Sequence, residues 1–146
     1  MRGLLHFIGQ SFDVNVRQFG CLSYYWNKMS MKKLRSSIVG IDNGDEVLFE
    51  DFEDGGEMWT GRGQRERRRR INFSEKYQSR PTVHLSISLW DMDAGTVLRA
   101  DVSAEAVTEK GFDMVFRTWG DTKVARARIA WTAIGELDDD SVWDIG

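Results

Sequence analysis

The strongest constraint on the fold is an alternation of apolar and polar residues that repeats from residue 65 onward. The stretch 82–89 is the clearest example, because its odd positions are aliphatic and its even positions are Thr, His or Ser. Successive side chains of a strand point to opposite faces, so this pattern predicts a half-buried strand. Four further stretches show the same period, at 66–73, 97–104, 112–118 and 124–133. Residues typical of turns, such as Gly, Pro and Asp, separate the stretches.

Five strands at this spacing favour an antiparallel β-sandwich, and a sixth short strand is conceivable at 47–49. No helical period is long enough to compete. The chain has 146 residues, of which 41% are hydrophobic, which is enough for one domain with a buried core plus an extension. We expect the sandwich to span residues 61–137, after an irregular N-terminal extension or docking arm at 1–60 and before an acidic tail at 138–146.

The predicted extension has two parts. In residues 1–30, aromatic side chains occur without a clean period. Two interpretations remain open for them: a genuine extension, whose apolar side chains need a partner to bury them, or a stretch upstream of a translation start at Met31. Residues 40–64 are rich in Gly and acidic residues, and they predict a loop-rich arm.

Charge is distributed in blocks along the chain. Residues 41–61 carry eight acidic residues and no basic one, whereas residues 62–70 carry six Arg and one Glu. In a strand the Arg run splits between two faces, so it does not form a single phosphate-binding patch. The net charge of −3 also does not fit a nucleic-acid-binding domain. We therefore expect no nucleic-acid partner, and we predict that the run forms a solvated face or ion pairs with the acidic arm.

Several function classes are disfavoured. With one Cys and two His residues, the chain cannot build a disulfide framework or a Cys-rich or His-rich metal site, so we expect no metal and no cofactor. No apolar run approaches the ~18 residues of a membrane span, and the apolar stretch at 3–8 is too short for a convincing signal peptide. A carboxylate pair drawn from Asp91, Asp93 and Asp121 could hydrolyse a glycoside, but turn Asp residues commonly cap their own backbone. We expect no enzyme, and a glycosidase using Asp91 and Asp121 remains the third hypothesis.

The stretch from Ile71 to Gly135 carries an ordered set of short motifs. They are the Ser-Ile pair in LSIS, Asp91 before a turn, Leu98-Arg99, Gly111-Phe112, TWGDTKV and IAWTAI. In this order and spacing, residues 65–135 resemble the H-type lectins, the snail-agglutinin group that also includes the C-terminal domain of discoidins. The resemblance implies a six-stranded antiparallel β-sandwich that assembles as a trimer or hexamer. It also implies sugar sites in clefts between subunits, with a preference for galactose-type rings such as N-acetylgalactosamine.

The same resemblance implies a set of sugar-contacting residues. In the family, an Arg at the position of Arg99 hydrogen-bonds sugar hydroxyls, and a Trp at the position of Trp119 shapes the pocket wall. Two contacts of the family are altered in this sequence. The residue after that Trp is a His in the snail protein and is Gly120 here, and the family's loop Asp has no counterpart in residues 61–64. Gln64 can substitute for the Asp as an amide donor and acceptor. The predicted carbohydrate site is Gly61, Gly63, Gln64, Arg99, Trp119 and Gly120.

Two functions follow as hypotheses. The first is a carbohydrate-binding lectin without catalysis, for cell or surface adhesion, whose weak single sites gain avidity from three or six copies. The second is a structural or adhesion module of a larger assembly, such as a phage-like tail fibre, in which sugar binding is altered or lost. In either case residues 1–60 would attach the assembly to a larger fibre or particle. The resemblance favours an extracellular, cell-surface or virus-like-particle location.

Overall fold

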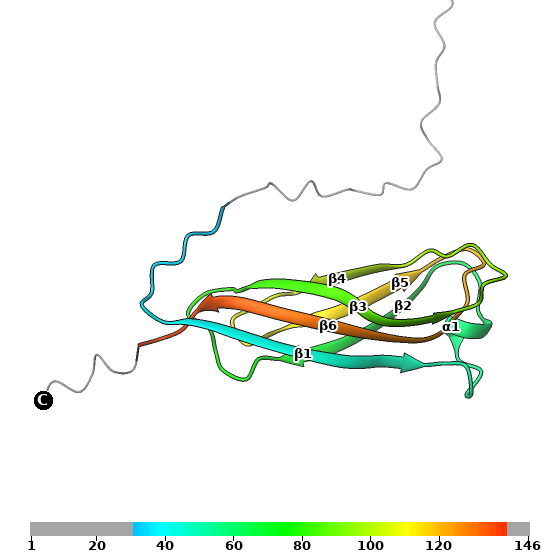
Figure 1. Ribbon diagram of the computed structural model, residues 1–146, viewed down its shortest axis with the longest axis horizontal. Coiled ribbons are helices and arrows are strands. Elements are labelled where there is room, and N and C mark those ends of the chain that lie inside the picture. Colours follow the sequence, from blue (N-terminus) through cyan, green and yellow to red (C-terminus); the bar gives the residue numbers. More distant parts are fainter. Residues whose placement is uncertain (1–30, 140–146) are drawn as a thin grey trace, which may run out of the picture. The chain divides into compact units, whose positions relative to one another are not determined.

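Two three-stranded antiparallel sheets lie face to face in the computed structural model, which describes residues 31–139 (Figure 1). The first sheet has the order β1-β6-β3 and the second β2-β5-β4. The elements are β1 (Val39–Glu50), α1 (Glu57–Thr60), β2 (Arg65–Asn72), β3 (Thr82–Met92), β4 (Asp101–Glu105), β5 (Gly111–Thr118) and β6 (Val124–Glu136). The predicted six-stranded antiparallel β-sandwich is therefore confirmed. The interpretations of residues 1–30 and of most of the acidic tail fall outside the described residues.

The core lies between the central strands β5 and β6. The side chains of Phe112, Met114 and Phe116 on β5 are fully buried, as the period-two pattern predicts. Trp131 on β6 packs edge-on against Phe112, with ring centroids 5.5 Å apart, and also contacts Phe73. Three of the predicted inner-face residues of β3, Val83, Leu85 and Ile87, pack against the same core. The fourth, Leu89, does not, because a bulge after Ile87 shifts the register and pairs Leu89 with Arg128. The one helix in the described part of the chain, α1, has four residues, and nothing between residues 31 and 139 qualifies as a membrane-spanning helix.

Strand β1 corrects the prediction of a loop-rich arm. Residues 39–50 pair with β6 from Val39 to Glu50, so the first sheet begins well before residue 61. Gly44 explains why a Gly-rich stretch forms a strand here: a Cβ at this position would lie 2.5 Å from Nε1 of Trp131. The strand thus uses Gly to make room for a large core side chain, a role that composition alone does not reveal.

Strand β4 is shorter than predicted and begins at Asp101 rather than at residue 97. In the preceding residues, the carbonyl of Val97 accepts a hydrogen bond from the Thr122 hydroxyl at 2.6 Å. The carbonyl of Arg99 accepts one from the Thr118 hydroxyl at 2.7 Å. Side-chain hydroxyls therefore replace the ladder hydrogen bonds, and the segment is held in place without strand pairing.

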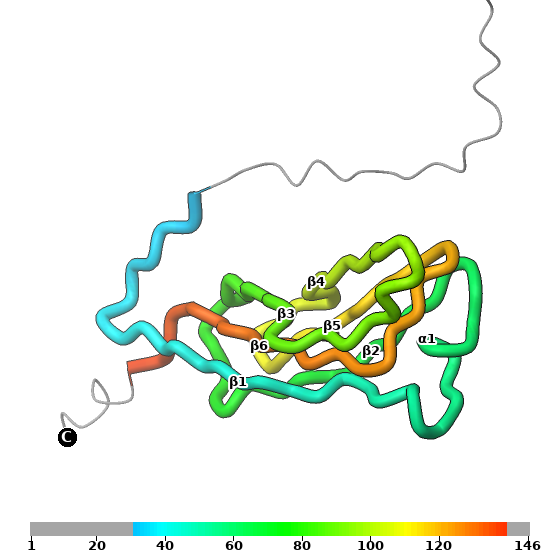
Figure 2. The backbone as a smooth tube through the Cα atoms, turned by 45° about the vertical axis from the view of Figure 1, so that its right-hand side comes forward, coloured from blue at the N-terminus to red at the C-terminus, as the bar shows by residue number. Residues whose placement is uncertain are grey.

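The two ends of the sandwich unit are tied to each other (Figure 2). The backbone N–H groups of Arg35 and Ser36 both donate to the carboxylate of Glu136. The Ser37 hydroxyl donates to the carboxylate of Asp139 at 2.8 Å. The segment entering β1 and the segment leaving β6 therefore lie side by side.

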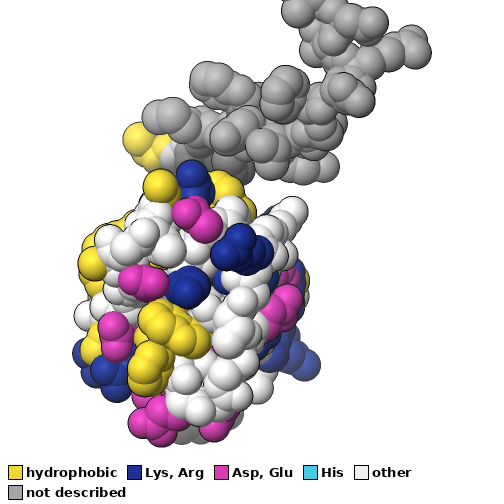
Figure 3. Space-filling view, turned by 90° about the vertical axis from the view of Figure 1, so that its right-hand side faces the viewer, with side chains coloured by type: hydrophobic (Ala, Val, Ile, Leu, Met, Phe, Trp, Pro, Cys, Tyr) yellow, Lys and Arg dark blue, Asp and Glu magenta, His cyan; other side chains and the backbone are white. Residues whose placement is uncertain are grey.

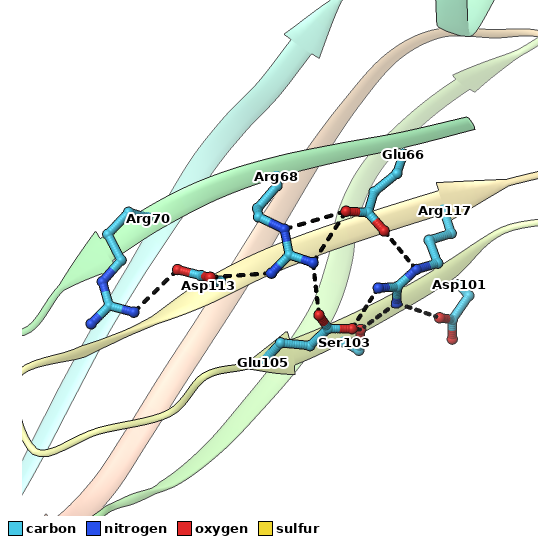
Figure 4. A network of polar contacts seen from close by, with 8 residues as sticks. All are labelled: Glu66, Arg68, Arg70, Asp101, Ser103, Glu105, Asp113 and Arg117. Carbon is cyan, nitrogen blue, oxygen red and sulfur yellow. Dashed lines mark hydrogen bonds and ion pairs between the residues drawn. The ribbon is translucent and has the colours of Figure 1, made fainter. Parts of the chain in front are cut away.

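Four members of the Arg run, Arg67 to Arg70, form ion pairs, as predicted, and they divide between the two faces of β2. Arg68 and Arg70 lie on the outer face together with Arg117 of β5 (Figure 4). Arg68 donates to the carboxylates of Glu105 at 2.8 Å and Asp113 at 3.1 Å. The pairs lie over β5, whose Val115 is fully buried even though it is on this outer face. The apolar stems of these Arg side chains are suited to covering it.

Two other members of the run join the two sheets along one edge. Arg67 pairs with Asp51 at 2.9 Å, and Arg69 pairs with Glu46 at 3.1 Å. Both carboxylates belong to the acidic stretch 41–61, with which the run was predicted to form ion pairs. This confirms the predicted ion pairing within the chain.

The outer-face network predicts acid sensitivity. Hydrogen bonds from Arg117 and Arg68 lower the pKa of Glu105 from its ordinary value of 4.5. Hydrogen bonds from Arg70 and Arg68 likewise lower the pKa of Asp113 from 3.8. A carboxyl group whose pKa is lower in the folded state stabilises the fold at neutral pH, and this contribution is lost as the pH falls through the folded-state pKa. The melting temperature should therefore drop when the pH is lowered below about 4.5.

The contribution of Glu105 can be isolated with the Glu105→Gln variant. We expect this variant to melt at a lower temperature than the wild type at neutral pH and to lose fewer degrees on acidification, by circular dichroism. Glu53→Gln, at an exposed turn position, serves as the matched control. Equal acid-induced shifts in the wild type and in Glu105→Gln would contradict this role of the network.

Candidate functional site

The predicted site residues come from three segments at the end of the sandwich where β2 begins and β5 ends. Arg65 pairs in register with Thr118, which brings the loop 61–64 beside the turn 119–123. The N–H of Gly63 donates to the carbonyl of Gly120 at 2.8 Å. Both glycines have positive φ angles, 80° for Gly63 and 70° for Gly120, which residues other than Gly rarely adopt. The glycines thus shape the two turns and join them.

Arg65 holds this end of the molecule together, and its role was missed at the sequence level. Its side chain is 3% exposed. One guanidinium nitrogen donates to the carbonyls of Gly61 at 2.8 Å and Met58 at 3.2 Å, and another donates to the carbonyl of Thr122 at 2.7 Å. Nε donates to the carbonyl of Gly63. A single buried side chain therefore fixes the loop before β2 and the turn before β6.

Arg99 lies against the Gly120 turn. Its Nη1 donates to the carboxylate of Asp121 at 2.9 Å, and a Cβ on Gly120 would lie only 2.9 Å from the same nitrogen. Gly120 therefore leaves the space that the guanidinium occupies. The Arg99 side chain remains about one-third exposed, so its other N–H donors can reach a ligand. The guanidinium also lowers the pKa of the Asp121 carboxyl, which keeps it ionised.

The structure brings together four of the six predicted site residues, namely Gly61, Gly63, Arg99 and Gly120. The other two flank this group in the chain and are exposed: Gln64 follows Gly63, and Trp119, 44% exposed, precedes Gly120. Asp121 joins these residues through its hydrogen bond with Arg99, although it was predicted only as a possible catalytic residue. Its position two residues after Trp119 is the sequence feature that could have placed it in the carbohydrate site.

The other two carboxylates considered for hydrolysis, Asp91 and Asp93, have partners of their own. Asp93 accepts a hydrogen bond from the N–H of Gly95 at 2.8 Å, which is the predicted capping of its own turn. Asp91 lies 3.9 Å from Arg126. Among residues 31–139, the structure gathers no group of three or more His, Cys, Asp or Glu side chains in a metal-binding arrangement.

Comparisons with known proteins bear on this geometry. The family model for the H-type lectin domain matches residues 68–134. The chain is 50% identical over 107 residues to the protein named ATP synthase subunits region ORF 7 of Fuscovulum blasticum, covering 73% of this chain and 93% of that protein. It is 36% identical over 75 residues to a discoidin-1 polypeptide of Dictyostelium discoideum, covering 51% of this chain and 30% of that protein.

A solved structure, that of recombinant discoidin II of Dictyostelium discoideum, shares the fold. The TM-score is 0.59 at 24% identity, over 71% of this chain and 39% of that chain. The chain thus spans about a third of the length of the discoidins. The sequence matches, together with the two-sheet architecture, place this chain among carbohydrate-binding domains of the lectin type, and it belongs to the H-type lectin domain family.

Proposed function

We propose that this protein is a lectin that binds galactose-type sugars, including N-acetylgalactosamine, at the end of the sandwich formed by Arg99 and the turn 119–121. The observation that carries this proposal is the pairing of Arg99 with Asp121 on the turn that begins with the exposed Trp119. One short turn and one neighbouring Arg supply hydrogen-bond donors, an ionised acceptor and an aromatic ring. These are the groups needed to hold an uncharged polyhydroxylated ring.

Each group has a role that suits a sugar. The Arg99 guanidinium carries several fixed donors, and its delocalised charge is weakly hydrated, so its desolvation costs less than that of Lys. The Asp121 carboxylate accepts hydrogen bonds from hydroxyl groups. Trp119 offers an apolar surface for the C–H face of the ring. The glycines of the adjoining turns allow close approach of the backbone, and Gln64 adds an amide at the rim.

Asp121 also argues for binding without hydrolysis. The family's loop Asp is absent from residues 61–64, and Asp121 places a carboxylate next to Arg99 from a different turn. Because Arg99 lowers its pKa, this carboxyl is poorly suited to be a glycosidase general acid, which requires a raised pKa. We therefore assign Asp121 to sugar recognition.

Removal of Arg99 tests the site directly. Arg99→Ala deletes hydrogen bonds from a charged group, each typically contributing ~1.5–3 kcal/mol, so affinity should fall about ten- to hundredfold. The measurement is a glycan array followed by titration with the sugars that bind. Arg69→Ala is the matched control, since Arg69 is a similarly exposed Arg with a carboxylate partner on a different part of the domain.

The outcome of this test separates the two hypotheses for function. A wild-type array with no hits would favour the alternative, a structural or adhesion module whose attachment to cells does not change in Arg99→Ala. If glycans bind and Arg99→Ala binds them as tightly as Arg69→Ala does, the sugar site lies elsewhere.

We further propose that the protein acts as a homotrimer or hexamer in surface adhesion, with sugar sites between subunits and residues 1–60 attaching it to a larger fibre or particle. The outer face of the sheet β1-β6-β3 is the proposed contact. It carries Arg126 and Arg128, and it also exposes apolar side chains, including Ile41 at 66% and Ile134 at 40%. Exposed apolar groups beside paired charges are typical of protein interfaces.

Light scattering measures this assembly. The full chain and the chain shortened to residues 31–146 should both have the mass of three or six copies. The charge reversals Arg126→Glu and Arg128→Glu should give monomers, because they place repelling charges on the contact face. An unchanged mass in these variants would remove this face from the interface, and monomers of the unmodified chain would rule out sugar sites between subunits.

A further inference from the structure

A second aromatic group lies at the same end of the domain, outside the residues matched by the family model. Phe52 is 59% exposed, and its ring packs edge-on against that of Trp59, with centroids 4.9 Å apart. The ammonium group of Lys123 lies 5.7 Å from the centroid of the Trp59 ring. A single exposed Phe needs no explanation, whereas an exposed Phe packed on a half-buried Trp beside a cation combines an apolar surface with hydrogen-bond donors.

The segment that carries this pair is rigidly held. The carboxylate of Asp51 accepts hydrogen bonds from the N–H of Met58 at 2.8 Å and from Arg67 at 2.9 Å. The N–H of Asp51 donates to the carbonyl of Ala125 on β6 at 2.7 Å. Met58, next to Trp59, is fully buried. The backbone on both sides of the two rings is therefore held in place before any ligand arrives, which lowers the entropic cost of binding.

The pair is also linked to the candidate site by short stretches of chain. Trp59 precedes Gly61 by two residues, and Lys123 follows Asp121 by two, so each Cα lies within ~7 Å of a site residue. The carbonyls of Met58, Gly61 and Thr122 all accept hydrogen bonds from the Arg65 side chain. Arg65 therefore holds the backbone next to Trp59 and the backbone next to Lys123 in a fixed relative position. Figure 3 looks onto this end and shows hydrophobic side chains gathered among charged ones.

We propose that Phe52, Trp59 and Lys123 form a second sugar subsite. It takes the next pyranose ring of an oligosaccharide whose terminal galactose-type ring is held at Arg99, so the inference rests on the proposed function. The exposed Phe52 ring stacks on the C–H face of this second sugar, and Trp59 supports the Phe52 ring from the side. The Lys123 ammonium donates hydrogen bonds to the sugar's hydroxyls. The ligand is therefore an oligosaccharide rather than a single sugar.

The experiment compares a monosaccharide with disaccharides on the full chain. Titration calorimetry is performed with methyl β-galactoside, and with lactose and other galactose-terminated disaccharides that differ in linkage. The variants are Phe52→Ala and Trp59→Ala, with Trp90→Ala as the matched control because Trp90 is as exposed as Phe52 but lies on β3. We expect at least one disaccharide to bind the wild type roughly two- to tenfold more tightly than the monosaccharide. Phe52→Ala and Trp59→Ala should abolish this advantage without changing the affinity for methyl β-galactoside.

Two other outcomes overturn the proposal in distinguishable ways. If the monosaccharide binds but no disaccharide binds better, or if the variants keep the advantage, the second subsite is absent while the proposed function stands. If neither the monosaccharide nor any disaccharide binds the wild type, the proposed function fails and the subsite with it.

A measurement on the wild type guards against variants that do not fold. The chain is labelled with 5-fluorotryptophan, and fluorine NMR signals are assigned by single substitutions. The disaccharide should shift the signals of both Trp59 and Trp119, whereas methyl β-galactoside should shift that of Trp119 only. A Trp59 signal that does not respond to any bound disaccharide would contradict the subsite.

Discussion

Replacing Arg65 by Met should lower the free energy of unfolding by about 2–6 kcal/mol, because two buried carbonyls lose their donor at a typical cost of ~1–3 kcal/mol each. These are the carbonyls of Met58 and Thr122, both bound by the Arg65 guanidinium in the interior. Sugar affinity should fall as well, since the turns that carry Gly63 and Gly120 are no longer joined through this side chain. Urea denaturation gives the stability, and titration below the unfolding transition gives the affinity.

Two further variants define what Arg65 contributes. Arg65→Lys keeps the charge but not the planar fork, so it should recover only part of the stability. Arg69→Met removes an exposed Arg of the same strand with a single ion pair, and it should cost at most ~1 kcal/mol. If Arg65→Met were no more destabilising than Arg69→Met, Arg65 would not be the anchor of this end.

Trp131→Ala should destabilise the domain by about 3–5 kcal/mol, which is enough to unfold many domains of this size. Trp131 is 7% exposed, and it contacts the rings of Phe73 and Phe112, which belong to the opposite sheet or directly follow one of its strands. Its removal therefore opens a cavity between the sheets that Gly44 cannot fill. Thermal melting and near-ultraviolet circular dichroism measure the loss.

The control for this variant is Trp90→Ala. Trp90 is 59% exposed on the edge strand β3, so its truncation should change stability by no more than ~0.5 kcal/mol. Comparable losses in the two variants would mean that Trp131 is not a major contact between the sheets.

A strand of this fold could be predicted from the sequence wherever one of its faces is buried and the other is exposed to solvent. On β3 and β5 this difference produces a clear alternation, and both predicted strands are found, β3 extending three residues beyond the predicted end at 89. On β1 the signal fails because the inward positions include Gly44, whose purpose is visible only when Trp131 is opposite it. A pattern within one segment cannot show what another segment places against it.

The same limit explains what was missed at the candidate site. The family resemblance located Arg99 and Gly120, and the structure brings them together. The alternation that puts Ile71 on the inner face of β2 also puts Arg65 there, yet an Arg on an inner face gives no hint of its carbonyl partners. The Asp121 carboxylate is likewise in the sequence, but its pairing with Arg99 depends on two turns meeting in space.

The tie between residues 35–37 and 136–139 has a consequence for how the domain can be mounted. The segments entering β1 and leaving β6 lie at one end of the sandwich, and the turns of the candidate site lie at the other, separated by the 13 residues of β6 or roughly 40 Å. A protein fused to either of these segments would therefore leave the turns at the opposite end of the sandwich accessible. The same holds if the whole domain is inserted into a loop of another protein. The domain can therefore be attached through the end that carries residues 35–37 and 136–139 without covering the candidate site.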